Sequence, residues 1–537
     1  MTSQTLSATS ALPAQSGRPM RHRVHIYRGW IGAALLILAC ALPMLFLHTP
    51  PMADVLGHIG RYSIQTGLRD HSWLKAYYGF EWRVIGNLGA DLLVEALHPL
   101  LGVEAAAALI AALVPILAAS GILLLSRQIH GRVTAASVLA LSLIYAVPFT
   151  WGFLNFSLSM ALALLAFNLW VFLERRGHLR PRALLFVPLG LAIWLCHTFG
   201  WALLGLLCGA RSLTLSRKNG RNWPQALTDA ALSCLPLLAP LLPMALWRND
   251  AAASGIAGWF NPLAKVAWLI AMLRLDHEWF DKVSAVALLL VVYIGMRSPR
   301  VTADRTMATA ALIAFIAYLL LPMQVFGSLY ADMRLAPYVV MLALLSLRDY
   351  DRPRRMLMAF ALAFLAMRLA LTGFTYHQRE RMLDAQMEAL SAIPEGARLA
   401  TLVQRSCESD WEMPWLTHVG SLALARKHLF ANDQWAFSGM NLLSVHYPAA
   451  GTFATDTAEI VYPERCEGDG PTLAKSLAHL PLGAFTHVWV IGVPLEAIPH
   501  REGLTLIWKR ADAAVFAVTA GHEPHGPGIR KLSKFQP

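Results

Sequence analysis

Residues 30–58 read WIGAALLILACALPMLFLHTPPMADVLGH, an apolar run that ends in a short polar segment. The run from Trp30 to Leu47 is long enough for one membrane helix and lacks a small-residue cleavage site, so we expect it to be retained. Basic flanks favour the cytoplasmic side of a membrane, so Asp54 is expected on the opposite side. The basic residues before the run are Arg18, Arg21, His22, Arg23 and Arg28.

The composition of the chain is that of a membrane protein. Of its 537 residues, 56% are hydrophobic and only 15% are charged, and soluble domains could not bury so much apolar surface. The formal net charge is +12, and a basic balance can indicate nucleic-acid binding. Here the Lys and Arg residues lie in short connectors between apolar runs, where they set topology. The sequence therefore predicts no nucleic-acid partner.

Apolar runs predict about eleven crossings, with the N-terminus inside and the C-terminus outside. The stretch 183–210 is ~28 residues long and has basic clusters at both ends, which favours two short crossings around an outer turn at 196–201 over one tilted helix. Three prolines near residue 240 should kink the helix there. The other expected spans are 30–47, 104–126, 133–150, 155–174, 228–247, 283–296, 307–325, 334–348 and 355–373.

Three domains are expected from the changes in composition. Residues 1–27 form a disordered basic cytoplasmic arm, residues 28–376 form the transmembrane domain with an outer loop at 50–102, and residues 377–537 form an extracytoplasmic soluble α/β domain. In the last domain we expect a helix at 380–392 and strands at 398–403, 487–491, 504–508 and 513–518, the last two as a hairpin.

Cysteines and outer loops add further expectations. Cys407 and Cys466 are the only cysteines of the C-terminal domain, and an oxidising compartment would permit them to pair. The other outer segments large enough for a site are 248–282 and the turn 327–334. Apolar residues at helical spacing predict a surface helix over 84–93. Asn155, which begins a span, is expected to cap it.

The pattern resembles the GT-C superfamily of integral-membrane glycosyltransferases. The shared features are a short inner N-terminus, a long first outer loop with an acidic residue just beyond the first helix, many spans and an extracytoplasmic C-terminal domain. Bacterial membrane proteins of this type carry runs similar to Asn87-Leu88-Gly89-Ala90-Asp91 and Trp151-Gly152-Phe153-Leu154-Asn155-Phe156. This chain has a lone Asp54 where several branches have an adjacent acidic pair, which leaves the branch and the acceptor open.

The resemblance implies transfer of a sugar from a polyprenyl-phosphate donor to an extracytoplasmic acceptor, an envelope glycan or lipid, at the bacterial inner membrane. A carboxylate must take the acceptor's proton, and cationic or polar groups must stabilise the leaving phosphate. We expect Asp54 to be the base and Arg334 the first phosphate ligand, because its planar fork suits phosphate. Secondary substrate-binding candidates are His58, Asp91, His197, Lys265 and Arg274.

Each candidate has a structural alternative. Asp54 could cap the helix that follows, and His58, one turn later, could orient it or sit at the membrane interface. Arg334 could pair with Asp332 or anchor its helix in lipid headgroups. His197 could cap its turn. Asp91 could bind a neighbouring backbone.

Two other functions compete with glycosyl transfer. One is a transporter or flippase for a lipid-linked substrate, although the spans hold few charges and no internal repeat is visible. The other is a non-catalytic scaffold for envelope assembly. No metal-binding motif is present, and a divalent metal held mainly by the donor phosphate stays open.

Overall fold

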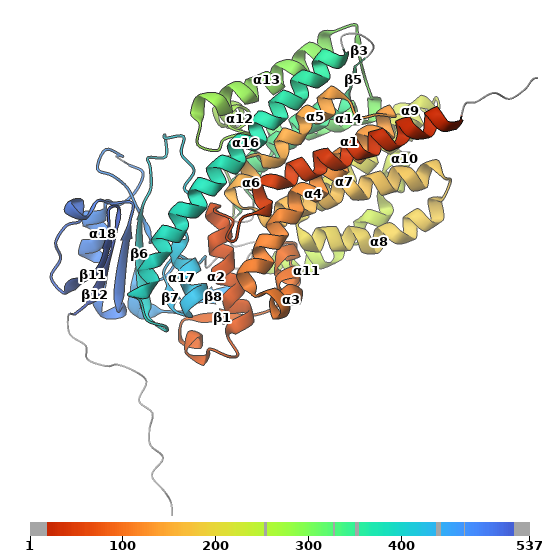
Figure 1. The fold of residues 1–537 in the computed structure, drawn as a ribbon. Coiled ribbons are helices and arrows are strands. Elements are labelled where there is room, and N and C mark those ends of the chain that lie inside the picture. The colour runs from red at the N-terminus through yellow and green to blue at the C-terminus, as the bar shows by residue number, and fades with distance from the viewer. Residues whose placement is uncertain are drawn as a thin grey trace, which may run out of the picture.

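The computed structural model describes residues 19–251, 255–325, 328–349, 354–435, 442–466 and 468–519. Its helices form an elongated bundle, and a β-sheet with short helices is attached to one end of that bundle (Figure 1). The predicted fold class, a polytopic helical membrane protein with a C-terminal α/β domain, is confirmed. Residues 1–18 of the predicted disordered arm lie outside the described residues, whereas 19–27 already belong to the first helix.

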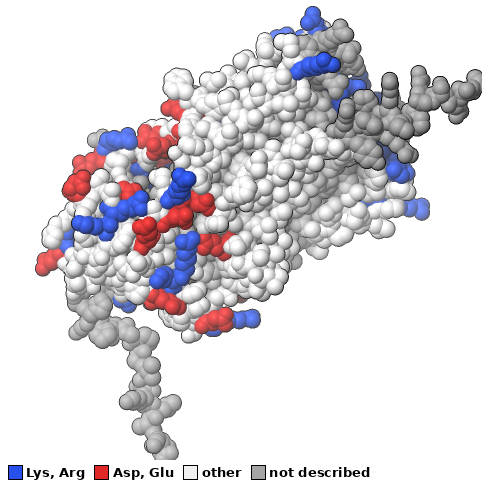
Figure 2. All heavy atoms as spheres, viewed as in Figure 1, with Lys and Arg blue, Asp and Glu red and all other residues white. Residues whose placement is uncertain are grey.

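The bundle has the apolar surface of a membrane protein. Figure 2 shows a broad band with few charged side chains, between a sheet-bearing end with charges of both signs and an opposite end where the visible charges are Lys and Arg. Such a band fits a lipid-facing belt between two aqueous ends. Within the described residues, six helices are long and apolar enough to cross a membrane: Val103–His130, Leu154–Arg175, Leu179–Cys196, Thr198–Lys218, Glu278–Arg297 and Arg355–Ser391.

The helices of the bundle follow each other along the chain, with a long outer segment between α1 and α4. They are α1 (Pro19–Leu45), α4 (Val103–His130), α5 (Ala135–Ala140), α6 (Val147–Trp151), α7 (Leu154–Arg175), α8 (Leu179–Cys196), α9 (Thr198–Lys218), α10 (Trp223–Cys234), α11 (Leu241–Ala251), α12 (Pro262–Ile270), α13 (Glu278–Arg297), α14 (Arg305–Leu320), α15 (Ala331–Ser346) and α16 (Arg354–Met387). Two short strand pairs join their loops: β2 (Ile256–Ala257) with β4 (Gln324–Val325), and β3 (Val301–Ala303) with β5 (Leu347–Asp349).

Proline explains where the predicted spans differ from the observed helices. The turn predicted at 196–201 is confirmed, because α8 ends at Cys196 and α9 begins at Thr198. The spans predicted at 133–150 and 228–247 are wrong as single helices, since short 3-10 turns interrupt both. Proline lacks an amide hydrogen and clashes with the carbonyl four residues earlier. Pro236 and Pro240 lie in the second break, and Pro148 and Pro243 lie in the first turn of the helix that follows each break. The kink predicted near 240 is confirmed.

The first outer segment contains α2 (Ala53–Gly67), β1 (Tyr78–Phe80) and α3 (Gly89–Leu101). The surface helix predicted over 84–93 begins only at Gly89. Residues 84–88 instead lie against the α8–α9 turn, because the Thr198 amide donates to the Gly86 carbonyl and the Leu88 amide donates to the Leu195 carbonyl. A Cβ on Gly89 would collide with the sulfur of Cys196, so this approach requires glycine.

Helix α16 connects the bundle to the sheet domain. A span at 355–373 and a separate helix at 380–392 were predicted, but one unbroken helix covers most of both. No proline interrupts the stretch, and a lone Gly373 costs a helix only about 1 kcal/mol. At about 51 Å the helix is longer than a membrane core of ~30 Å. Its C-terminal turns therefore reach the sheet (Figure 1).

The C-terminal sheet has the order β11-β12-β10-β6-β7, with β9 also paired to β6. The predicted strands and hairpin are confirmed, and parallel pairing of β6 with β10 places them at the centre. Cys407 and Cys466 form a disulfide that joins the segments after β6 and β9. The bounds are β6 (Arg398–Gln404), β7 (Phe430–Ala431), β9 (Ile460–Val461), β10 (His487–Ile491), β11 (Leu504–Arg510) and β12 (Ala513–Val518), and a strand β8 (Leu443–Val445) pairs with β1.

Candidate active site

A cavity of about 340 Å³ lies where the outer segment, the helical bundle and the C-terminal domain meet. Four of the predicted site residues line it together, although they come from α2, the α8–α9 turn and α15. These four are Asp54, His58, His197 and Arg334.

Asp54 lies in the first turn of α2 but does not cap it. Met52 occupies the N-cap position, and no side chain forms a cap hydrogen bond there. Burial raises the pKa of Asp54 to about 6, against the opposing effects of the nearby His418, Arg334 and Trp151 side chains. Gly152 brings its backbone against this turn with a φ of 110°. The result is a carboxylate poised to bind a proton near neutral pH.

His58 faces the same cavity one helical turn after Asp54. Its Nδ1 has no hydrogen-bond partner among the described residues, and its ring lies 5.0 Å from that of Trp435. Burial, together with the charge of Arg61, lowers the pKa of His58 well below its usual value. His58 is therefore a neutral, hydrogen-bonding group in the cavity wall.

Arg334 lies in the first turn of α15 and is half-buried. Its guanidinium carbon is 4.0 Å from the centre of the Phe153 ring, and its Nε has no partner within the described part of the chain. The pairing with Asp332 weighed from the sequence is not formed, since the Asp332 carboxylate accepts a 2.8 Å bond from Lys265. A guanidinium that lines a cavity and is paired with none of the described carboxylates is suited to bind an anion.

His197 combines the two roles considered for it. Its Nδ1 accepts the Phe199 amide at 3.1 Å and so caps α9, while its ring lines the cavity and meets Phe156 edge-on. Burial lowers the pKa of His197 to about 3, with a smaller contribution from Arg334. The ring is therefore uncharged, and the cation of the cavity is Arg334.

The other three predicted residues lie outside this cavity. Asp91 is fully buried, where it pairs with Arg61 and accepts a bond from Asn155. Lys265 is buried beside Asp332. Arg274 donates to the backbone carbonyls of residues 410–412. Capping was expected for Asn155. Its side chain instead accepts a hydrogen bond from the Ala90 amide and so joins α7 to α3. A part in substrate binding stays a prediction for these residues.

Arg274 lines a second cavity of about 270 Å³ beside the first. Trp151 and Tyr330 belong to the walls of both cavities, and their rings are 5.4 Å apart. The second cavity is mainly polar and is formed largely by the C-terminal domain, with Arg405 and Glu408 in its wall. The two rings thus separate an apolar chamber from a polar one.

The C-terminal domain contributes residues to the first cavity that the sequence did not reveal. Trp435 and Asp456 line it, more than 370 positions after Asp54 and in no recognised motif. One signal was present in α2: a Cβ on Gly57 would come within 2.5 Å of Trp435, and one on Gly60 within 2.7 Å of Ser421. Glycines three residues apart on one face allow another element to approach closely, here α17 (Val419–Lys427).

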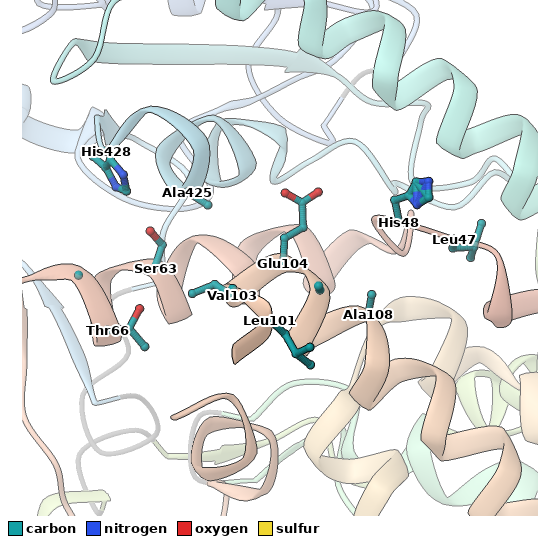
Figure 3. Close-up of a pocket in the computed structure, with 13 residues that line it drawn as sticks. Leu47, His48, Ser63, Thr66, Leu101, Val103, Glu104, Ala108, Ala425 and His428 are labelled. Carbon is teal, nitrogen blue, oxygen red and sulfur yellow. The ribbon is translucent and has the colours of Figure 1, made fainter. Parts of the chain in front are cut away.

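A larger groove of about 700 Å³ lies along another part of α2, with Ser63 and Thr66 in its wall (Figure 3). Glu104 points into this groove, but its carboxylate is bound by Arg426 at 2.6 Å and by Thr49. None of the seven predicted site residues lines it. The larger groove therefore holds none of the predicted site residues, whereas the smaller cavity holds four of them.

Comparison with known proteins gives a likeness of general arrangement. No protein-family model matches the sequence, and no curated protein matches it. Solved structures that resemble it include ArnT from Cupriavidus metallidurans bound to undecaprenyl phosphate, with 14% identity, a TM-score of 0.46, and coverage of 91% of this chain and 98% of that chain. The apo state of that ArnT has 13% identity, a TM-score of 0.47, and coverage of 92% and 98%. Likeness at this level concerns only the general course of the chain.

Proposed function

We propose that the protein is a membrane glycosyltransferase of the GT-C type, which moves a sugar from a polyprenyl-phosphate donor to an extracytoplasmic acceptor. The observation that carries the proposal is the arrangement of two groups around one cavity. Asp54 is a carboxylate with a raised pKa, and Arg334 is a guanidinium in the cavity wall that forms no ion pair with the described carboxylates. Glycosyl transfer from a lipid phosphate needs one group of each kind.

The two cavities suit the two substrates. Aromatic and aliphatic side chains form much of the wall of the first, which fits a donor whose lipid tail comes from the membrane. The polar second cavity fits a hydroxyl-bearing acceptor that arrives from the aqueous side. The shared wall of Trp151 and Tyr330 would bring the acceptor hydroxyl toward Asp54. The aliphatic and phenyl side chains of the first wall are Phe153, Leu154, Phe156, Phe199, Met244, Val325, Leu329 and Ala331.

The proposed reaction balances with these groups alone. Asp54 takes the proton of the acceptor hydroxyl as the acceptor oxygen forms a bond to the anomeric carbon. The bond between that carbon and the phosphate oxygen breaks, and the polyprenyl phosphate leaves with the electron pair. Arg334 stabilises the charge that develops on the phosphate, while neutral His58 and His197 orient the sugar through hydrogen bonds.

The proposed topology follows from charge. Charged side chains visible at the end of the bundle opposite the sheet are Lys and Arg (Figure 2), and such residues favour the cytoplasm. We therefore place the N-terminus inside, and Asp54 and the C-terminal domain outside, at the bacterial inner membrane. The disulfide Cys407–Cys466 supports this side, because disulfides persist in oxidising compartments.

Mass spectrometry of envelope glycans and polyprenyl-phosphate sugars tests the proposal in the native host. The strains are the wild type, a deletion strain, and that deletion complemented with the wild-type gene or with Glu81→Gln. Glu81 is an exposed carboxylate that pairs with Arg83, so this variant is a matched control. We expect the deletion strain to lose one glycan residue and to accumulate the corresponding lipid-linked donor. The wild-type gene and the Glu81→Gln gene should both restore the glycan. Unchanged glycans and donors in the deletion strain would overturn the proposal.

A further inference from the structure

Three ligating side chains of the C-terminal domain converge behind Asp54. An Nδ1 or Nε2 of His418 and one carboxylate oxygen each of Asp456 and Glu459 all lie within 4.8 Å of one another. The Nε2 of His418 is 3.9 Å from an oxygen of Asp456. Atoms that bind one cation at about 2.1 Å are roughly 3–4 Å apart, so a small contraction would place all three around a common ion.

Glu459 supplies the second observation. Its side chain is fully buried, and neither carboxylate oxygen has a hydrogen-bond partner among the described residues. Its nearest charged neighbours include the carboxylate of Asp456. Two buried carboxylates repel each other unless a proton or a cation lies between them. The two carboxylates therefore need a proton or a cation between them.

The orientation of His418 favours a cation over a proton. Its Nδ1 lies 2.8 Å from the backbone carbonyl of Asp433, and a proton on that nitrogen leaves the lone pair of Nε2 directed at the two carboxylates. Histidines that bind metals are held in this way, by a hydrogen bond from the other ring nitrogen. The carboxylate of Asp433 is fixed in turn by Ser421, through its hydroxyl at 2.6 Å and its amide at 2.7 Å.

We propose that His418, Asp456 and Glu459 bind one divalent transition-metal ion of the Zn²⁺ or Mn²⁺ class. One imidazole and two carboxylates match these ions, and three protein ligands leave a coordination position open. Asp456 also lines the cavity that contains Asp54, so the open position can face that cavity. Binding of the ion does not depend on the proposed reaction, and it would add positive charge where an anionic substrate is expected.

A second cluster provides an internal control. His71, Glu395 and His428 also bring ligand atoms within 4.8 Å of one another, and the two imidazole rings stack at 3.6 Å. Glu395 is exposed, and the cluster lies at the larger groove and not at the Asp54 cavity. A metal that binds only at accessible histidines would choose this cluster.

The test uses the full chain, purified in detergent, stripped with a chelator and titrated with Zn²⁺ and with Mn²⁺. Elemental analysis gives the stoichiometry, and the thermal unfolding midpoint gives an independent readout. We expect about one tightly bound ion per chain and a raised midpoint. Glu459→Gln and Asp456→Asn should each weaken the Kd at least ~10-fold, while His428→Gln should leave it unchanged.

Two results would overturn the proposal. In the first, the wild-type chain binds no ion and its midpoint does not respond, which would make Glu459 a buried protonated acid. In the second, the Glu459 and Asp456 variants bind as the wild type does while His428→Gln does not, which would assign the metal to the surface cluster. If Glu459→Gln fails to fold, Asp456→Asn, whose side chain is less deeply buried at 9% exposed, decides the question.

Discussion

Two aspartates of the first outer segment differ in how they interact with a nearby arginine. Asp91 is fully buried and pairs directly with Arg61, whose side chain is also buried. Asp54 and Arg334 influence each other electrostatically and line one cavity, but they form no ion pair within the described part of the chain. A closed pair satisfies its own charges and holds the fold, whereas an open pair leaves both charges for a third molecule. This difference is the reason why we propose Asp54, and not Asp91, as the base.

The largest expected effect is on the open pair. Asp54→Asn preserves shape but removes the base, so the transfer rate should fall ~10²–10⁴-fold. The thermal midpoint should stay near that of the wild type, because no cap bond or ion pair is lost. The check is complementation of the deletion strain, scored as glycan restored per molecule of protein in the membrane. Full restoration by Asp54→Asn would make Asp54 structural.

The closed pair should respond in the opposite way. Asp91→Asn leaves Arg61 as an unpaired buried cation, which typically costs about 3–5 kcal/mol. We expect low protein levels and a lower unfolding midpoint, with activity per folded molecule preserved. Unfolding of purified protein in detergent measures the first effect, and turnover normalised to folded protein measures the second. A stable Asp91→Asn protein without activity would place Asp91 among the functional residues.

Arg334 allows the open pair to be tested from its other side. Arg334→Gln should weaken donor binding and turnover by roughly 10–100-fold, which is the value of about 1.5–3 kcal/mol for a charged hydrogen bond. Arg334→Lys keeps the charge but loses the fork, so it should recover part of that loss. Kinetics at varied donor concentration separate the two variants. Equal activity of Arg334→Gln and the wild type would exclude a phosphate contact.

The pH profile sharpens the comparison further. The pKa of Asp54 is raised to about 6, so the active base is half-protonated there and is lost as the pH falls. We expect kcat/KM to decrease about tenfold per unit below that midpoint and to level off above it. The profile should be measured with the wild type and with Arg334→Lys as a charge-preserving comparison. A flat profile between pH 5 and 7 would argue against Asp54 as the base.

The smallest effect is expected in the larger groove. Glu104 and Arg426 are both about one-third exposed, and a pair of this kind contributes about 0–1 kcal/mol. Glu104→Gln should therefore shift the unfolding midpoint slightly and leave glycan transfer unchanged. A large loss of transfer in this variant would move the proposed site to the groove of Figure 3.

Much of the fold could be predicted from the sequence because the signals are local. Apolar runs with basic connectors gave most spans, and the basic clusters on both sides of 183–210 predicted the turn at His197 that the structure contains. Alternating apolar residues predicted the strands at 398–403 and 487–491. The break before Pro148 and the continuity of α16 were missed, although Pro148 and the lack of a proline between residues 354 and 387 are both visible in the sequence.

The site was only partly predictable from the sequence, because it combines residues that local signals mark with residues brought close only by folding. Asp54, His58 and Arg334 stand out because polar residues beside apolar spans are rare, and the structure brings them to one cavity. The metal candidates His418, Asp456 and Glu459 are ordinary residues of a soluble domain in the sequence. Docking of α17 on the glycine face of α2 brings that domain close to Asp54. Gly57 and Gly60 show where α2 permits a close approach, but they do not show which element approaches.

The central claim is tested most directly with purified protein and the lipid extract of the deletion strain. Wild type and Asp54→Asn are each mixed with that extract and an envelope fraction, and mass spectrometry counts the polyprenyl phosphate released. The account predicts release by the wild type, matched by transfer of the sugar, and release at least ~100-fold slower with Asp54→Asn. Equal release by both proteins, or no release by the wild type, would contradict it.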